Sequence, residues 1–131
     1  MLPTTICYSN ALIRQLEMER CAMNDKVIIV EGKTDKQQLM RVLDEPVHII
    51  CTYGTISFER LEELSEELEE KDVFVLVDAD DAGEKLRRQL TQEIPHAEHL
   101  YITMLHREVA ETPLNYLTRI LRAAKFKVLT V

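Results

Sequence analysis

Short runs of apolar, largely β-branched residues alternate with helical patterns along this 131-residue chain. Strand–helix alternation of this kind predicts βαβ units and a mostly parallel sheet. The runs are apolar throughout rather than at every second position, so we expect helices to cover both faces of that sheet. The expected strands are residues 27–30, 47–51, 73–77 and 99–103, and the expected helices begin at Thr34, Ser57, Gly83 and Thr112.

Further elements are expected at the two ends of this α/β core. Residues 9–22 have the pattern of an extra helix before the first strand. For the C-terminal helix, Thr112 is the expected N-cap and Pro113 the first helical residue. The last residues, 126–131, suit an edge strand. The length suits a single domain, residues 1–131, with its core at about residues 26–103.

The net charge, the lengths of the apolar runs and the cysteines argue against several classes of protein. The net charge of −7 argues against a protein that holds nucleic acid by bulk electrostatics. No apolar run approaches the ~18 residues of a transmembrane helix, and the first residues lack a signal-peptide pattern, so we expect a cytoplasmic protein without a membrane partner. The three cysteines, Cys7, Cys21 and Cys51, are too few and too widely spaced for a disulfide framework or a zinc site.

Acidic residues follow two of the expected strands directly. Glu31 follows the first strand, and Asp78 and Asp80 follow the third. In open α/β sheets, ligands bind outside the carboxyl ends of the strands, so these three side chains are candidates for one site. Grouped carboxylates suit a hard divalent cation such as Mg²⁺, which also takes water and substrate phosphates. The alternative is structural, because acids after a strand often cap the next helix.

Glycines and lysines lie beside the same acids. Gly32, Gly54 and Gly83 are the chain's three glycines, and each follows an expected strand. Glycine there allows close approach of the backbone to a ligand, or a positive φ. Lys33 and Lys85 could contact phosphate oxygens, although single lysines are more often solvated charges.

Two of these motifs resemble the Toprim domain. That domain is shared by type IA and type II topoisomerases, bacterial primases, overcoming-lysogenization-defect nucleases and recombination-repair proteins of the RecR type. The family has a strand-end glutamate followed by glycine and a later strand-end Asp-x-Asp, which here are Glu31-Gly32 and Asp78-Ala79-Asp80. The segments EGKTD and GEKLR are most similar to the Toprim domain of the 5S ribosomal RNA maturase, a bacterial nuclease.

The resemblance implies a Rossmann-like Toprim fold with a four-stranded sheet. It also implies that Glu31 is a general acid or base, and that Asp78 and Asp80, with Glu31, hold Mg²⁺ or Mn²⁺. Domains that topoisomerases, primases and the maturase add have no counterpart in this sequence. We therefore expect a small stand-alone Toprim protein, whose RNA or DNA substrate is held by the domain itself, by a homo-oligomer or by a protein partner.

Three functions remain open on the sequence. The first is a Mg²⁺-dependent phosphodiester enzyme, such as a nuclease. The second is a non-catalytic Toprim module that binds nucleic acid or a partner in DNA repair or RNA metabolism. The third is a phosphatase of the haloacid-dehalogenase type, which also has an Asp-x-Asp motif. In that class the motif follows the first strand, whereas here it follows the third.

Overall fold

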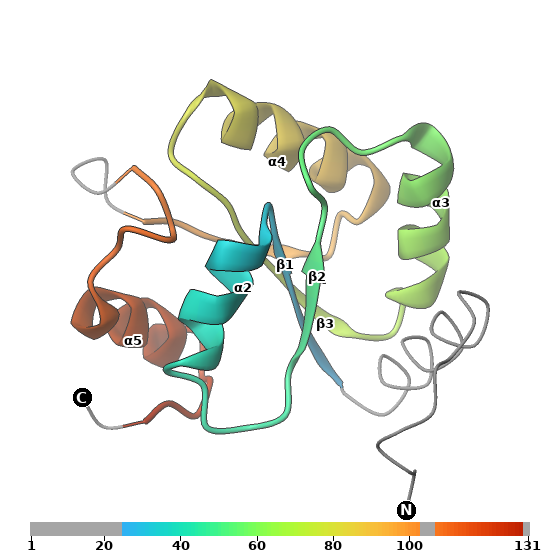
Figure 1. Ribbon diagram of the computed structural model, residues 1–131. Coiled ribbons are helices and arrows are strands. Elements are labelled where there is room, and N and C mark those ends of the chain that lie inside the picture. Colours follow the sequence, from blue (N-terminus) through green and yellow to red (C-terminus); the bar gives the residue numbers. More distant parts are fainter. Residues whose placement is uncertain (1–24, 103–106, 130–131) are drawn as a thin grey trace, which may run out of the picture.

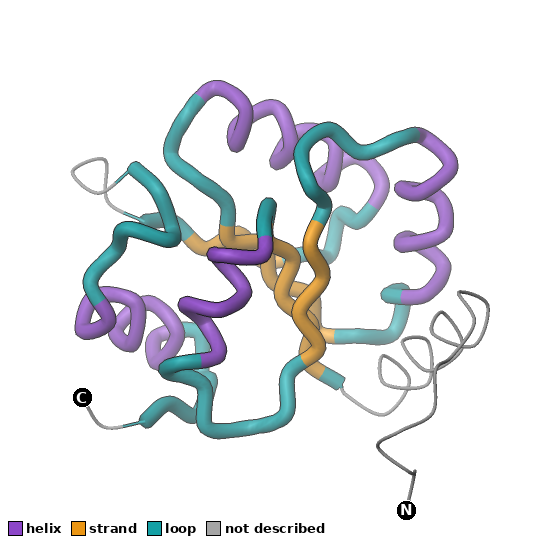
Figure 2. Tube along the Cα trace, viewed as in Figure 1, coloured by secondary structure: helices purple, strands orange, loops and turns teal. Residues whose placement is uncertain are grey.

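Four parallel strands form one sheet, and helices lie on both of its faces (Figures 1 and 2). The computed structural model describes residues 25–102 and 107–129. The strand order is β2-β1-β3-β4, and every neighbouring pair is parallel, which confirms the expected fold class. The elements are β1 (Lys26–Val30), α2 (Lys33–Met40), β2 (His48–Cys51), α3 (Phe58–Glu67), β3 (Asp72–Leu76), α4 (Asp81–Glu93), β4 (Glu98–Leu100) and α5 (Leu114–Ala123).

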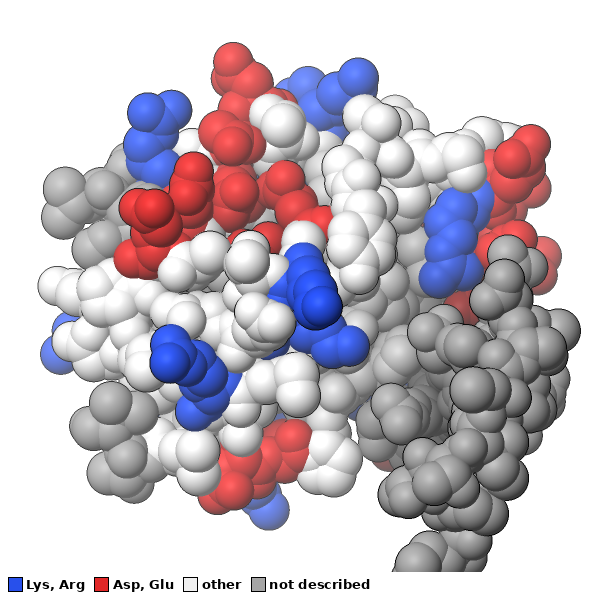
Figure 3. Space-filling view, viewed as in Figure 1, with Lys and Arg blue, Asp and Glu red and all other residues white. Residues whose placement is uncertain are grey.

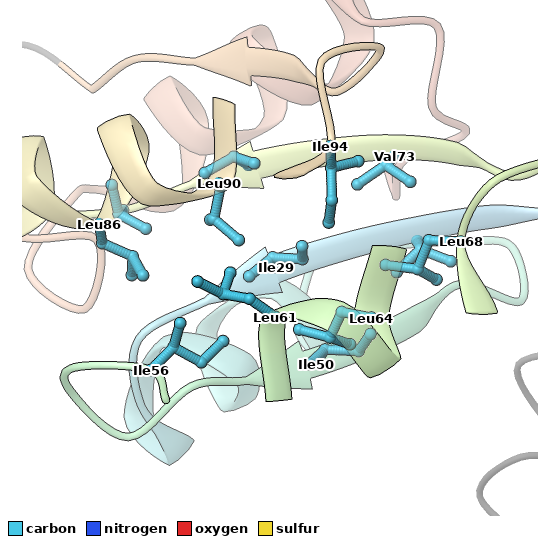
Figure 4. Packing of buried hydrophobic residues seen from close by; sticks show 13 residues of the cluster. Ile29, Ile50, Ile56, Leu61, Leu64, Leu68, Val73, Leu86, Leu90 and Ile94 are labelled. Carbon is cyan, nitrogen blue, oxygen red and sulfur yellow. The ribbon is translucent and has the colours of Figure 1, made fainter. Parts of the chain in front are cut away.

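Each central strand contributes to two hydrophobic cores. Successive side chains of a strand point to opposite faces of the sheet. On one face, Val27 and Ile29 of β1 pack with leucines of α3 and α4 (Figure 4). On the other face, Ile28 and Val30 pack with Leu39 of α2 and with leucines of α5. Burial on both faces explains why β1 is apolar at consecutive positions.

The path of the chain creates a switch point between β1 and β3. From β1 the chain passes through α2 to β2 at one edge, and it returns through α3 to β3 on the other side of β1. Leu39 of α2 packs on one face of the sheet, and the leucines of α4 pack on the opposite face. The connections that leave β1 and β3 therefore diverge. Divergence at the carboxyl ends of parallel strands opens a crevice where ligands bind.

The structure confirms the expected cap at the start of α3 and corrects the one at the start of α2. The Ser57 hydroxyl accepts a hydrogen bond from the first turn of α3, as expected of an N-cap. The assignment of Thr34 was wrong, because α2 already begins at Lys33 and Gly32 is its N-cap. The helix begins earlier because the Asp35 carboxylate accepts a hydrogen bond from the Gly32 N–H at 3.0 Å.

The start of α5 also differs from the expectation. Pro113, not Thr112, is at the N-cap position, and the helix begins one residue later. The Thr112 hydroxyl donates to the carbonyl of Glu108 at 2.8 Å. It closes the preceding turn and therefore does not cap the helix.

The remaining expectations concern the chain ends. The edge strand over 126–131 was wrong for the residues that the structure describes, because Val128 makes only an isolated antiparallel bridge to Leu43. Leu43 itself lies between turns, so it offers no strand to pair with. The expected helix at 9–22 lies outside the described residues. In the described ranges, no helix is both long and apolar enough to cross a bilayer.

Candidate functional site

Glu31 and Asp78 lie together at the switch point. Glu31 directly follows β1, and Asp78 is two residues beyond the end of β3. The backbone N–H of Asp78 donates to Glu31 Oε1 at 3.0 Å. This hydrogen bond joins the ends of the two central strands and orients the Glu31 carboxyl toward the loop that follows β3.

The Asp78 side chain is held by the segment that follows β4. Its Oδ1 accepts a hydrogen bond from the backbone N–H of Val109 at 2.8 Å. The neighbouring Ala79 N–H donates to the carbonyl of Arg107 at 2.6 Å. Val109 is fully buried, which fixes this segment against the core. A loop more than 25 positions along the chain thus sets the direction of the Asp78 carboxyl.

Asp80 is the N-cap of α4. This is the structural role that the sequence suggested as an alternative for an acid after this strand. Its Oδ1 accepts a hydrogen bond from the Gly83 N–H at 2.7 Å. Gly83 is buried, and a Cβ at this position would overlap the carbonyl oxygen of Asp78. Glycine is therefore required for the loop to fold back so closely on the start of the helix.

Five carboxyl groups interact at this edge: Glu31, Asp35, Asp78, Asp80 and Glu108. Burial raises the pKa of Glu31, and repulsion from Asp78 and Asp80 raises it further, against the effect of the hydrogen bond from the Asp78 N–H. Burial, then repulsion from Asp80, likewise raises the pKa of Asp78 against the hydrogen bond that its carboxyl accepts. Burial and repulsion from Asp78 and Glu108 raise the pKa of Asp35. Figure 3 shows acidic side chains gathered in one patch, with basic side chains beside it.

Within the described residues, each of the carboxyls of Glu31, Asp78 and Asp80 leaves one oxygen available to a cation. One oxygen of each accepts a backbone N–H, and the second has no hydrogen bond within residues 25–102 and 107–129. In those ranges no three His, Cys, Asp or Glu side chains converge closely enough to be a metal site by themselves. Mg²⁺ commonly takes one or two carboxylates and completes its shell with water and substrate phosphates. An all-oxygen, mutually repelling donor set therefore fits a hydrated Mg²⁺ or Mn²⁺ ion.

The raised pKa values predict that Asp78→Asn stabilises the metal-free protein at neutral pH. A carboxyl whose pKa is higher in the folded than in the unfolded state favours folding while it is protonated, so this stability is lost as pH rises from about 4 through the raised pKa. The amide can still accept the Val109 N–H while the repulsion disappears. We expect the melting temperature in EDTA at pH 7 to rise by about 3–6 °C, the shift that ~1 kcal/mol produces in a small domain.

The control for this experiment is Asp72→Asn. Asp72 is exposed at the opposite end of β3, so the same change of charge should leave the melting temperature nearly unchanged. Millimolar Mg²⁺ should stabilise the wild type more than Asp78→Asn, because only the wild type keeps the full ligand set. A lower melting temperature for Asp78→Asn in EDTA would mean that the carboxylate stabilises the fold rather than straining it.

The other predicted site residues lie around the carboxyls. Lys33 and Lys85 are exposed in the early turns of α2 and α4, and no ion pair joins either to the cluster within the described residues. Gly32 has an extended backbone and room for a Cβ, so sterics do not require glycine there. Gly54 has φ +100°, the left-handed region that the sequence argument expected at a strand-end glycine.

Arg87 of α4 belongs to the surroundings of the site and was missed from the sequence. It is 5% exposed, and its Nη2 donates to the carbonyl of Leu100 at 2.6 Å. Its guanidinium carbon lies 4.1 Å from the ring centroid of Tyr101. Burial lowers the pKa of the guanidinium, and the charges of Tyr101, Glu84 and Glu31 oppose that shift. The available signal was spacing, because Arg87 lies three residues before Leu90 and therefore on the buried face of the helix.

The strand order β2-β1-β3-β4 and a strand-end glutamate beside an Asp-x-Asp loop together indicate the family of this domain. Residues 26–111 match the Toprim domain, and the chain belongs to that family. Toprim domains generally bind divalent metal ions. The resemblance inferred from Glu31-Gly32 and Asp78-Ala79-Asp80 is confirmed.

Three relatives place the chain within this family. A solved structure of a small Toprim domain protein from Bacillus stearothermophilus superposes with a TM-score of 0.78 at 57% identity, covering 81% of this chain and 90% of that one. The uncharacterized protein YusF of Bacillus subtilis (strain 168) is 48% identical over 120 residues, which are 92% of this chain and 82% of that protein. Ribonuclease M5 of Mycoplasma pneumoniae (strain ATCC 29342 / M129 / Subtype 1) is 38% identical over 79 residues, 60% of this chain but only 43% of the ribonuclease.

Proposed function

We propose that this protein is a Mg²⁺-dependent enzyme that cleaves phosphodiester bonds in nucleic acid. The observation that carries the proposal is the pairing of Glu31 with Asp78 at the switch point, through the hydrogen bond from the Asp78 N–H to Glu31 Oε1. Asp80 repels Glu31 from the same loop. A proton-transfer group thus lies beside two carboxylates that can hold a cation. The name of the ribonuclease M5 relatives supports a substrate of the nucleic-acid class.

In the proposed mechanism Asp78 and Asp80 would hold Mg²⁺ or Mn²⁺. The ion, when bound, would supply stabilisation for negative charge on a phosphoryl oxygen. Glu31 transfers a proton through Oε2, since Oε1 is occupied by the Asp78 N–H. It takes the proton from the attacking water or gives one to the leaving oxygen.

The substrate backbone is proposed to lie across the starts of α2 and α4. Lys33 is the first residue of α2 and Lys85 the fifth of α4, and both can contact phosphate oxygens. Gly32 and Gly54 place no side chain in the turns after β1 and β2, and Gly83 places none in the first turn of α4. Helix N-termini favour anions near the same edge. A cytoplasmic location, and a homo-oligomer or protein partner that completes the substrate surface, belong to the same proposal.

A second candidate is a binding module without catalysis. The observation that favours it is the net charge of −7, which gives the domain little general attraction for the phosphates of a substrate. The part that matches the ribonuclease M5 relatives spans less than half of their length. Such a module would still bind a cation through Asp78 and recruit nucleic acid or a protein.

The test is a cleavage assay with purified protein on single-stranded RNA, single-stranded DNA and duplex DNA. Each substrate is incubated with Mg²⁺, with Mn²⁺ or with EDTA. We expect cleavage of at least one substrate that EDTA abolishes and that Asp78→Asn strongly reduces, while Asp72→Asn cleaves like the wild type. Metal binding and nucleic-acid binding without cleavage of any substrate would favour the binding module.

A further inference from the structure

Two exposed tyrosines bracket the carboxyl cluster. Tyr53 follows β2 and is 74% exposed, and Tyr101 directly follows β4 and is 63% exposed. β2 and β4 are the outer strands, and the strands that carry Glu31 and Asp78 lie between them. At about 4.8 Å per strand interval, the outer strands are ~14 Å apart. One large aromatic ring thus lies on each side of the proposed reaction centre.

The Tyr101 ring is held by a buried cation. The guanidinium of Arg87 lies 4.1 Å from its ring centroid, a cation–π contact. Arg87 is itself fixed by the carbonyl of Leu100 at 2.6 Å and by His99 Nδ1 at 3.1 Å. Tyr101 also borders a cavity of about 300 Å³ that Asp80 lines. The ring is therefore oriented beside the cation-binding loop.

The backbone of Tyr53 is fixed beside the end of β1. Its N–H donates to the carbonyl of Glu31 at 2.7 Å. Its φ is +55°, a conformation that bulky residues rarely adopt. Tyr53 also borders a cavity of about 430 Å³ along β2 that Lys36 and Arg60 line. A strained backbone that presents an exposed ring beside two cations suggests selection for a contact outside the domain.

We propose that Tyr53 and Tyr101 are stacking platforms for unpaired bases of a single nucleic-acid strand that crosses the Glu31–Asp78 cluster. Lys36 contacts its phosphates beside Tyr53. Arg60 does so by exchanging its ion pairs with Glu63, at 3.1 Å, and Glu67, at 3.8 Å, for a contact with a phosphate. With a net charge of −7 the protein gains little from general attraction to phosphates, and stacking supplies affinity without charge. The inference rests on the proposed function and names its substrate class as single-stranded nucleic acid rather than duplex.

The test measures binding by fluorescence anisotropy in the Glu31→Gln background, so that the strand stays intact. The probes are labelled single strands of about 12 nucleotides, as RNA and as DNA, the abasic DNA backbone of equal length, and the matching duplex. We expect at least one single strand to bind more tightly than both the abasic backbone and the duplex. The four proposed phosphate contacts, from Lys33, Lys36, Arg60 and Lys85, predict a slope of about −2.8 in log K against log salt.

The variants test each ring. We expect Tyr53→Ala and Tyr101→Ala each to weaken single-strand binding about 5- to 150-fold, and the matching Phe substitutions to restore it. Tyr116→Ala is the control, because Tyr116 lies on α5 beside Arg119. Abasic backbone that binds as tightly as the single strands, absence of all binding, or Ala variants within twofold of their parent would overturn the stacking proposal.

The experiments distinguish a failure of the stacking proposal from a failure of the proposed nuclease function. Tyrosine-dependent binding by a wild type that cleaves none of the substrates would support the platforms and refute the nuclease. Metal-dependent cleavage whose KM is unchanged by Tyr53→Ala and Tyr101→Ala would support the nuclease and refute the platforms. The RNA and DNA arms identify which sugar the site accepts.

Discussion

Glu31→Gln should lower the rate of metal-dependent cleavage by about 10²–10⁴-fold, the usual contribution of a general acid or base. The substitution removes the proton-transfer group but keeps an oxygen that can accept the Asp78 N–H. The loops that follow β1 and β3 should therefore keep their conformation, and the loss should appear in kcat. Single-turnover cleavage at saturating Mg²⁺, beside thermal melting, measures both effects.

Glu70→Gln is the matched control for Glu31→Gln. Glu70 is exposed and lies two residues before β3, at the opposite end of that strand from Asp78, and the change of charge is identical. Its cleavage rate should equal that of the wild type. If Glu31→Gln cleaves at the wild-type rate while Asp78→Asn does not, Glu31 is not the proton-transfer group and serves only to join the strand ends.

Gly83→Ala should have the largest effect on stability of any conservative change near the site. The added Cβ would overlap the carbonyl oxygen of Asp78 and lie 3.2 Å from Asp80 Oδ1. Neither oxygen can move away without a large cost in free energy, because the first belongs to the backbone and the second caps α4. We expect a loss of about 3 kcal/mol or more in the free energy of unfolding, and a fall of roughly 10–20 °C in melting temperature. Stabilisation by Mg²⁺ should disappear as well, because the displaced loop carries Asp78 and Asp80.

Ala82→Gly serves as the comparison for Gly83→Ala. Ala82 is the exposed neighbour on the same helix, so its substitution by glycine should cost only about 0.5–1 kcal/mol. Denaturant unfolding of both variants, with and without Mg²⁺, measures these differences. If Gly83→Ala unfolds at the wild-type denaturant concentration, the loop accommodates a side chain, and its tight turn is not what positions the two aspartates.

Local patterns in the sequence were sufficient for the sheet and for the central pair of acids. The apolar runs at 27–30 and 73–77 form β1 and β3, because strands buried on both faces must be apolar at consecutive positions. Parallel strands end at one edge, so Glu31 and Asp78 could be expected to meet there. Ser57 was also recognisable, because an N-cap depends on residues within one turn.

The exact starts of two helices could not be inferred in this way, although the hydrogen bonds that determine them are local. Thr34 and Thr112 were assigned as caps, but Asp35 starts α2 earlier and Thr112 bonds back to Glu108. Threonine is a suitable N-cap at both positions, but a competing hydrogen bond within four residues determined where each helix begins. Hydrogen-bond competition of this kind leaves no periodic signal in the sequence.

Residue periodicity was enough to locate the four strands, the helices between them and the acids that follow a strand. The positions of Tyr53 and Tyr101 on either side of those acids follow instead from the strand order, which only the folded arrangement reveals. The same arrangement also lets Val109 orient Asp78 and buries Arg87 beneath Tyr101. The physical reason is that such contacts join segments far apart in the chain, and their geometry follows from how the helices pack on the two faces of the sheet.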